Sequence, residues 1–145
     1  MENLFRGLPA PEETSFRELV KFSENNASKL LIHLPAFTAL IAREISFSDA
    51  YRISYEFSGK RIYLPKQKTV FEKKLQCSID SDTYQSILEL SSAEPHIEIP
   101  SAWGIFNVIR RVSLMDYLEK TKSKSMAQMA FGANRRFIDK LWNEK

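Results

Sequence analysis

The sequence is poor in the residues that most often perform chemistry. It has a single cysteine, Cys77, two histidines, His33 and His96, and only four glycines. A single cysteine excludes an internal disulfide and fits a reducing compartment. The histidines and the cysteine lie too far apart in the chain to have the ligand spacing of a zinc site. We therefore predict no metal and no cofactor.

The sequence motifs of common enzyme classes are also missing. There is no Gly-x-Ser-x-Gly, Walker or dinucleotide-binding pattern, and the shortage of glycine argues against a phosphate-cradling loop. The pair Asp80 and Asp82 is compatible with acid–base or metal chemistry, but capping of the helix that begins at Ser81 is the favoured interpretation. We predict that the protein is not an enzyme.

Long hydrophobic runs are absent as well. No apolar run reaches the roughly 18–20 residues that a membrane span needs. The longest candidate, residues 30–45, is interrupted by His33, Pro35, Arg43 and Glu44. The N-terminus has no apolar signal core. We predict a cytoplasmic protein with no membrane partner.

The chain contains enough apolar residues to form a core, and its charge is unevenly distributed along the sequence. Hydrophobic residues make up 43% and charged residues 27%, which argues against disorder. Residues 1–100 hold 12 Lys/Arg and 14 Asp/Glu, whereas residues 101–145 hold 9 Lys/Arg and 4 Asp/Glu. A basic segment attracts polyanions through counterion release. An ordinary solvated surface is the equally supported alternative for a charge bias of this size.

Hydrophobic periodicity predicts a mainly helical fold with two short strands. We expect residues 1–14 to form a flexible N-terminal arm, because they are polar and contain Pro9 and Pro11. Residues 15–100 are predicted to form a helical core and dimerisation region. Residues 101–145 are predicted to form a C-terminal helix-turn-helix region, with one helix ending near Arg111 and another capped by Ser113.

Within the predicted core, the chain repeats a helix-plus-strand pattern at about residues 48–71 and 81–106. Ser48 and Ser81 are the expected helix caps. The expected strands are residues 61–65 and 96–100, each ended by a proline. Whether these two strands pair within one chain or across a dimer is left open by the sequence.

The last part of the sequence has the spacing of a helix-turn-helix. Gly132 supplies the left-handed turn, and apolar residues on both sides of it are spaced to face one another: Ala127, Phe131, Ala133, Ile138 and Leu141. Ser125 and Asn134 are the expected caps of the two helices. A helical hairpin with a merely basic face is the alternative.

The outward residues of this segment have the composition of a recognition helix. Arginine bonds guanine in a bidentate way, asparagine does so with adenine, and lysine holds phosphate. We predict that Arg135 and Arg136 read base edges with help from Asn134 and Lys140. We predict phosphate contacts for Lys124, Ser125 and Gln128.

Two further groups of residues have both a structural and a nucleic-acid-binding interpretation. The tyrosines at 51, 55, 63 and 84 are spaced to fill a core or an interface, with base stacking as the alternative. The basic run Lys66, Lys68, Lys73 and Lys74 is expected to be a solvated face, with phosphate contact as the alternative.

With these residues in view, the chain resembles the Mor family of phage transcription activators and related prophage helix-turn-helix proteins. The similarity lies in residues 57–66, Phe-Ser-Gly-Lys-Arg-Ile-Tyr-Leu-Pro-Lys, and in Arg110–Arg111 leading through residues 114–117 to the Phe131–Gly132 turn. It covers roughly residues 36–142. Ser101 replaces the basic residue that follows the proline of the family's strand motif, and Arg135–Arg136 differ from the more polar recognition helices of the activators.

The resemblance implies a homodimer whose short strands pair across a two-fold axis, with a helix-turn-helix on each side. It further implies promoter binding and recruitment of RNA polymerase. Our first hypothesis is therefore a sequence-specific regulator that binds double-stranded DNA. The second is a protein-interaction adaptor that uses a helix-turn-helix scaffold in a phage or mobile-element complex.

Overall fold

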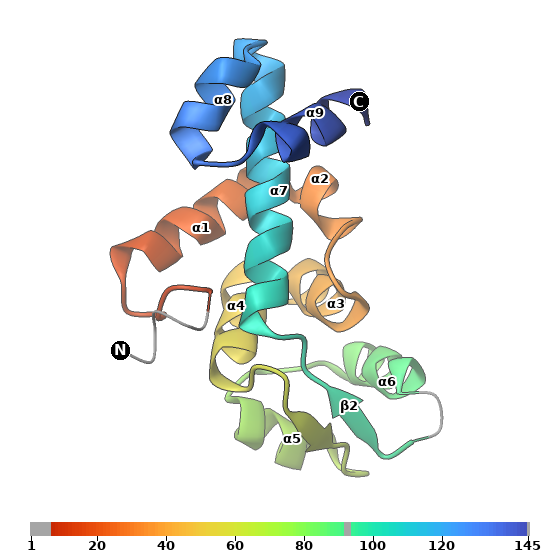
Figure 1. Cartoon of the computed structure of the whole chain (residues 1–145). Helices are drawn as coiled ribbons and strands as arrows, with labels where there is room; N and C mark the ends of the chain where they lie inside the picture. Colours follow the sequence, from red (N-terminus) through yellow and green to blue (C-terminus); the bar gives the residue numbers. More distant parts are fainter. Residues whose placement is uncertain (1–6, 92–93, 145) are drawn as a thin grey trace. The chain divides into compact units, whose positions relative to one another are not determined.

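The computed structural model describes residues 7–91 and 94–144, and it is mainly helical (Figure 1). In chain order its elements are α1 (Thr14–Asn25), α2 (Ala27–Leu31), α3 (Ala36–Glu44), α4 (Phe47–Glu56), β1 (Arg61–Tyr63), α5 (Lys68–Leu75), α6 (Ser81–Leu90), β2 (His96–Glu98), α7 (Ala102–Thr121), α8 (Lys124–Phe131) and α9 (Arg135–Asn143). The prediction of a mainly helical fold with two short strands is confirmed.

The chain divides into two compact units, Met1–Asn107 and Val108–Lys145, and the boundary falls inside α7. The predicted boundary at residue 100 lies before α7, whereas residues 102–107 belong to the first unit. The start of α7 is held there because Ala102 and Ile105 are buried and the Ala102 amide donates to Ser58 Oγ at 2.8 Å.

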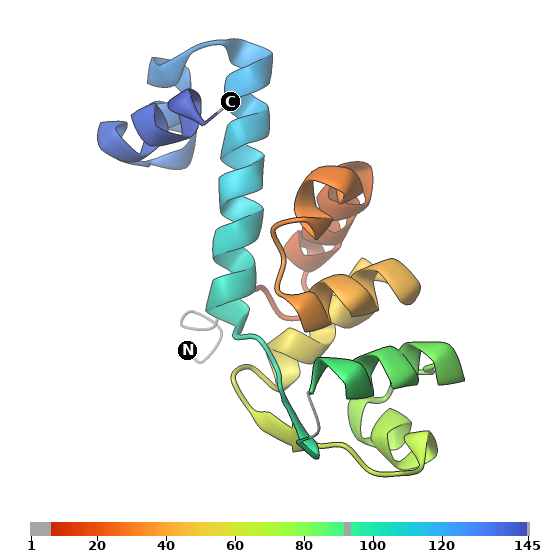
Figure 2. The same ribbon diagram turned by 90° about the vertical axis from the view of Figure 1, so that its right-hand side faces the viewer.

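In the first unit, α3 is the central helix. All six residues from Phe37 to Ala42 are buried, as expected of a helix covered on every side. It packs against α2, α4 and α6, and Figure 2 shows α3 and α6 side by side. This explains why the sequence around α3 has an apolar run without a clear polar face.

The two short strands pair with each other within one chain. They are antiparallel, with Arg61 opposite Glu98, Ile62 opposite Ile97 and Tyr63 opposite His96. Ile62 and Ile97 point into the core, while the residues that alternate with them are exposed or half-buried. The question left open by the sequence is thereby answered. The pairing across a two-fold axis that the resemblance implied is not what the structure has.

A buried polar contact joins α1 to α4. Tyr51 is fully buried, and its hydroxyl lies 2.6 Å from the buried Ser23 Oγ. Burial raises the pKa of Tyr51 to about 12, partly offset by the hydrogen bond with Ser23. Tyr51 is therefore a core residue, as the sequence favoured, and it is not accessible for stacking on bases.

The prediction of a flexible N-terminal arm is wrong for the part of the arm that the structure describes, which begins at Gly7. Leu8 and Ala10 are buried, and a Cβ built on Gly7, which has φ +89°, would lie 3.0 Å from the Trp103 backbone. Prolines prevented a helix there, but they did not prevent apolar side chains from packing. Residues 1–6 of the predicted arm lie outside the described residues.

Several helix starts differ from the predicted caps. Ser46 caps α4 in place of Ser48, and its side chain accepts a hydrogen bond from the Asp49 amide. Asp80 caps α6 by accepting from the Thr83 amide, which confirms the capping interpretation of the Asp80–Asp82 pair, whereas Ser81 is the first helical residue. The predicted break at Ser113 is also wrong. Residues 105–121 contain no glycine or proline, and α7 runs through Ser113 without interruption.

Candidate nucleic-acid interface

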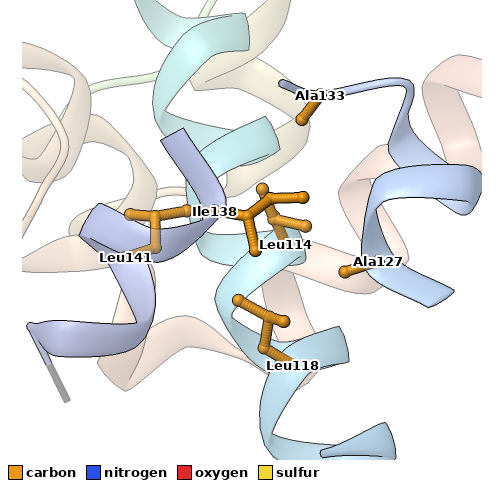
Figure 3. Packing of buried hydrophobic residues seen from close by; sticks show 6 residues of the cluster. All are labelled: Leu114, Leu118, Ala127, Ala133, Ile138 and Leu141. Carbon is orange, nitrogen blue, oxygen red and sulfur yellow. The ribbon is translucent and has the colours of Figure 1, made fainter. Parts of the chain in front are cut away.

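The second unit is built from the later part of α7 and the two C-terminal helices. Six buried side chains form its core (Figure 3): Leu114, Leu118, Ala127, Ala133, Ile138 and Leu141. Partly buried aromatic residues pack against them, and the Tyr117 and Phe131 rings meet edge to face with centroids 5.5 Å apart. Ala127 and Ala133 are small enough to let the helices approach closely. The apolar residues predicted to face one another thus contribute to one shared core.

The turn between α8 and α9 depends on Gly132. Its φ of 62° and ψ of 21° lie in the left-handed region, which costs a residue with a side chain roughly 1–2 kcal/mol. Its amide donates to the Gln128 carbonyl at 2.9 Å. From α7, the Arg110 guanidinium donates to the Phe131 carbonyl at 3.0 Å, which satisfies an acceptor at the end of α8.

Asn134 begins the last helix as predicted. Its Oδ1 accepts a hydrogen bond from the Phe137 amide at 2.8 Å. At the other end of α9, Arg111 of α7 forms a close ion pair with Glu144. Two packed helices joined by a three-residue turn and supported by a third helix have the arrangement of a helix-turn-helix.

The outward face of α9 is basic and polar. Ile138 and Leu141 point into the core, so at 100° per residue the opposite face holds Arg136, Lys140 and Asn143, at spacings of four and three. All three are exposed. Within the described part of the chain, no carboxylate lies within ion-pair distance of Arg136 or Lys140. Their charges are directed at solvent.

Arg135 differs from Arg136 because its charge is already paired with a carboxylate. Arg135 Nε lies 3.4 Å from Asp139 Oδ1, and Lys124 Nζ from α8 lies 3.0 Å from the same oxygen. Lys124 also sits 5.3 Å from the centre of the Trp142 ring, and its side chain is only 27% exposed. The hydrogen bond from Lys124, followed by the charges of both cations, lowers the pKa of Asp139 below its usual range.

This Lys124–Asp139–Arg135 network changes the predicted roles. Lys124 was expected to hold phosphate and Arg135 to read bases, but both are bonded to one carboxylate. The network ties α8 to α9, so these residues orient α9 on its support. The sequence signal was available: Arg135 and Asp139 are four apart on a helix, the spacing of a side-chain ion pair.

The cap of α8 lies two residues earlier than predicted. Ser123 caps the helix by accepting from the Met126 amide at 3.2 Å, and Ser125 lies inside it. Ser125 and Gln128 are exposed, which leaves them accessible for the expected phosphate contacts. Lys122, which precedes the cap with φ 55°, is a further exposed cation, and the sequence analysis did not include it among the candidate residues.

Two exposed methionines on α8 were also missed. Met129 is 86% exposed and Met126 is 51% exposed. Their spacing of three residues places them on the side of α8 away from Ala127. These flexible apolar side chains are suited to contact a partner surface.

The other candidate residues divide between structural and exposed positions. Lys68 of the basic run donates to the Ile79 carbonyl at 2.8 Å and pairs with Glu72 at 3.5 Å, so it holds a loop in place. Tyr84 is buried, whereas Tyr63 is 55% exposed. His33, which follows α2, is exposed although it lies in an apolar stretch of the sequence.

An apolar groove lies in the first unit between α3 and α6. It has a volume of about 480 Å³, and its walls combine leucines at 31, 34, 40 and 90 with the charged residues Arg43 and Glu89. Ile32, which adjoins this wall in the chain, is 77% exposed. Among the described residues, no helix combines the length and the apolar character needed to cross a membrane.

Comparison with known proteins adds no further identification. No family model matches the chain, and no curated protein or solved structure matches it either. The resemblance to the Mor family stays a prediction that rests on the residues quoted above.

Proposed function

We propose that the protein is a sequence-specific double-stranded DNA-binding transcription regulator that inserts α9 into the major groove. The observation that carries this proposal is the outward row of Arg136, Lys140 and Asn143, opposite the buried Ile138 and Leu141. A recognition helix needs such a row of free donors on a rigidly packed support.

The charge of the second unit supports the same proposal. Residues 108–145 hold nine Lys/Arg against four Asp/Glu, whereas residues 1–107 hold 12 Lys/Arg against 14 Asp/Glu. Phosphates are therefore attracted to the unit that contains α9. Arg136 reads a base edge, Lys140 and Lys122 neutralise phosphates, and Ser125 and Gln128 donate to the backbone of the duplex.

Asn134 takes a secondary part in the proposal. Its Oδ1 is occupied by the Phe137 amide, so its side chain fixes the start of α9 while its amide nitrogen stays available as a donor. Arg135 contacts DNA only together with Asp139, its partner in the ion pair. The base-reading role thus passes mainly to Arg136.

Other parts of the expected biology rest on the sequence alone. The phage or mobile-element setting, the cytoplasmic location and recruitment of RNA polymerase stay predictions. We leave the homodimer out of the proposal because its expected basis, strand pairing across a two-fold axis, is replaced by pairing within the chain.

The test is selection of random double-stranded DNA by the purified full chain, followed by titration of the best sequence at several salt concentrations. We expect an enriched motif and an affinity that falls as salt rises. The Arg136→Ala, Lys140→Ala double variant should lose enrichment, and a Lys66→Ala, Lys73→Ala variant, which removes two exposed lysines of the first unit, is the matched control. Unselective binding by the wild-type chain would contradict the proposal.

The adaptor is the second candidate, and the apolar groove between α3 and α6 is the observation that favours it. Apolar surface of this kind marks protein interaction sites. A protein complex insensitive to salt, found together with no DNA enrichment, would select the adaptor over the regulator.

A further inference from the structure

The first unit contains the same helix–strand–helix arrangement twice. The first copy is α4, β1 and α5, and the second is α6, β2 and the beginning of α7. Corresponding positions are buried in both copies: Ile62 with Ile97, Leu64 with Ile99, and Phe71 with Ile105. The sequence repeat is therefore a structural repeat.

The strand segments of the two copies are related by a local two-fold axis. An antiparallel strand pair has such an axis by construction, and here it passes between Ile62 and Ile97. The backbone bonds continue beyond the strands: the Leu64 amide donates to the Pro95 carbonyl at 2.7 Å, and the Ile99 amide donates to the Lys60 carbonyl at 2.8 Å. The facing edges of both copies are thus occupied within one chain.

Side chains also connect the copies. Tyr84 of the second copy donates its hydroxyl hydrogen to the Pro65 carbonyl of the first, and its ring lies 5.5 Å from the Phe71 ring. The Ala102 amide of the second copy donates to Ser58 Oγ of the first at 2.8 Å. The contacts that join two copies of this unit are made internally, and they need no second chain.

Only the second copy leads into a helix-turn-helix. The last helix of the first copy, α5, ends at Leu75, with Gln76 in the left-handed region at φ 53°, and the chain turns to α6. The corresponding helix of the second copy, α7, continues to Thr121 and into α8 and α9. In the described chain, one internal two-fold axis is therefore accompanied by one recognition helix.

We propose that a single chain binds a single, asymmetric DNA half-site. Dimeric helix-turn-helix proteins read two-fold symmetric operators because each subunit presents one recognition helix. This chain has the paired repeat inside one polypeptide and a recognition helix on only one of its halves. The inference rests on the proposed DNA-binding function and specifies its target as non-palindromic.

The internal pairing has a test that does not involve DNA. Arg61 and Glu98 are strand partners with exposed side chains, and directly opposite residues have Cα separations that a disulfide can bridge. The double variant Arg61→Cys, Glu98→Cys should oxidise to a cross-link within one chain and run as a monomer on a non-reducing gel. The single variants are the controls, and the buried native Cys77 has a raised pKa of about 11, which keeps it a poor competitor. Predominantly disulfide-linked dimers would overturn the inference.

The DNA test uses the motif obtained from random selection. We expect a motif without two-fold symmetry, a 1:1 complex by sedimentation velocity, and a salt slope of about −2, since the two cations assigned to phosphates, Lys122 and Lys140, each release about one counterion. Two copies of the motif placed as an inverted repeat should fill independently at any spacing. A palindromic motif bound cooperatively by two chains, with affinity lost when the spacing changes by about half a helical turn, would overturn the inference but leave the proposed function standing. No enriched motif would overturn both.

Discussion

Arg135 and Arg136 are adjacent in the sequence but differ in how far their charges are already neutralised. Arg135 shares the Asp139 carboxylate with Lys124, whereas Arg136 lies on the opposite side from the buried Ile138. An arginine held by a carboxylate must break or share that ion pair before it can bond a base. The free side chain therefore carries the base-reading role in this account.

Replacement of Arg136 by alanine is expected to weaken binding of the selected duplex by roughly 1–3 kcal/mol, about 5- to 150-fold. Arg135→Ala should weaken it less, because that side chain is engaged with Asp139. Fluorescence anisotropy at fixed salt measures both, with circular dichroism to show that the fold persists. A larger loss for Arg135→Ala than for Arg136→Ala would reverse the assignment.

Tyr51 gives a prediction about stability and pH. Its folded-state pKa is raised to about 12 from an unfolded value near 10, so its contribution is fully present below pH 10 and is lost as pH rises toward 12. Tyr51→Phe should destabilise the protein by about 1 kcal/mol at pH 7 through loss of the Ser23 hydrogen bond. The difference between variant and wild type should then shrink between pH 10 and pH 12.

Urea unfolding at pH 7 and at pH 11 checks this, and Tyr63→Phe is the control because Tyr63 is largely exposed. A stability difference that is the same at both pH values would mean that the hydroxyl of Tyr51 is not protected from ionisation by folding.

At the level of elements, the α8–α9 pair needs glycine at position 132 because of its backbone conformation and not because a side chain would clash there. Among the described residues, no heavy atom outside its two chain neighbours lies within 4 Å of a Cβ built on Gly132, yet its φ is +62°. Gly132→Ala should therefore cost roughly 1–2 kcal/mol through backbone strain alone, and Gly132→Asn should cost less because asparagine tolerates this conformation. Thermal unfolding of the three proteins measures the order, and an alanine variant as stable as the wild type would show that the turn readjusts freely.

Helices and strands with strong local signals were predicted, and starts and ends were not. Both strands and the Gly132 turn follow from short-range patterns, a β-rich triplet before proline and a glycine between apolar residues. The caps of α4 and α8 were misplaced by two residues because each helix start has two serines two residues apart, and tertiary packing decides which of them is the cap. The strand partner was undetermined because hydrophobic alternation does not specify whether a neighbour is in the same chain.

The candidate site was partly predictable for a similar reason. The outward face of α9 follows from helical periodicity, so Arg136 and Lys140 were identified correctly as exposed cations. The contact of Lys124 with Asp139 joins two helices, and no spacing rule within one helix predicts it. The exposure of Met129 likewise depends on how α8 is oriented on its support.

At the scale of the whole molecule, the two units differ in charge. The basic second unit should direct association with DNA, so Lys122→Glu should weaken binding to all duplexes alike and flatten the salt slope by about one or two units. Lys73→Glu, an exposed site of the first unit, is the matched control and should change neither. Equal effects of the two substitutions, measured by salt titration, would mean that DNA contacts both units.

The most direct test of the central claim is to repeat the random-duplex selection with an Arg136→Gln variant. Arginine prefers guanine and glutamine prefers adenine through bidentate contacts to the major-groove edge. If α9 reads DNA through its outward face, guanine is replaced or lost at one position of the motif while the other positions stay the same. An unchanged motif would contradict base reading by Arg136, and the absence of any motif from the wild-type chain would contradict sequence-specific DNA binding.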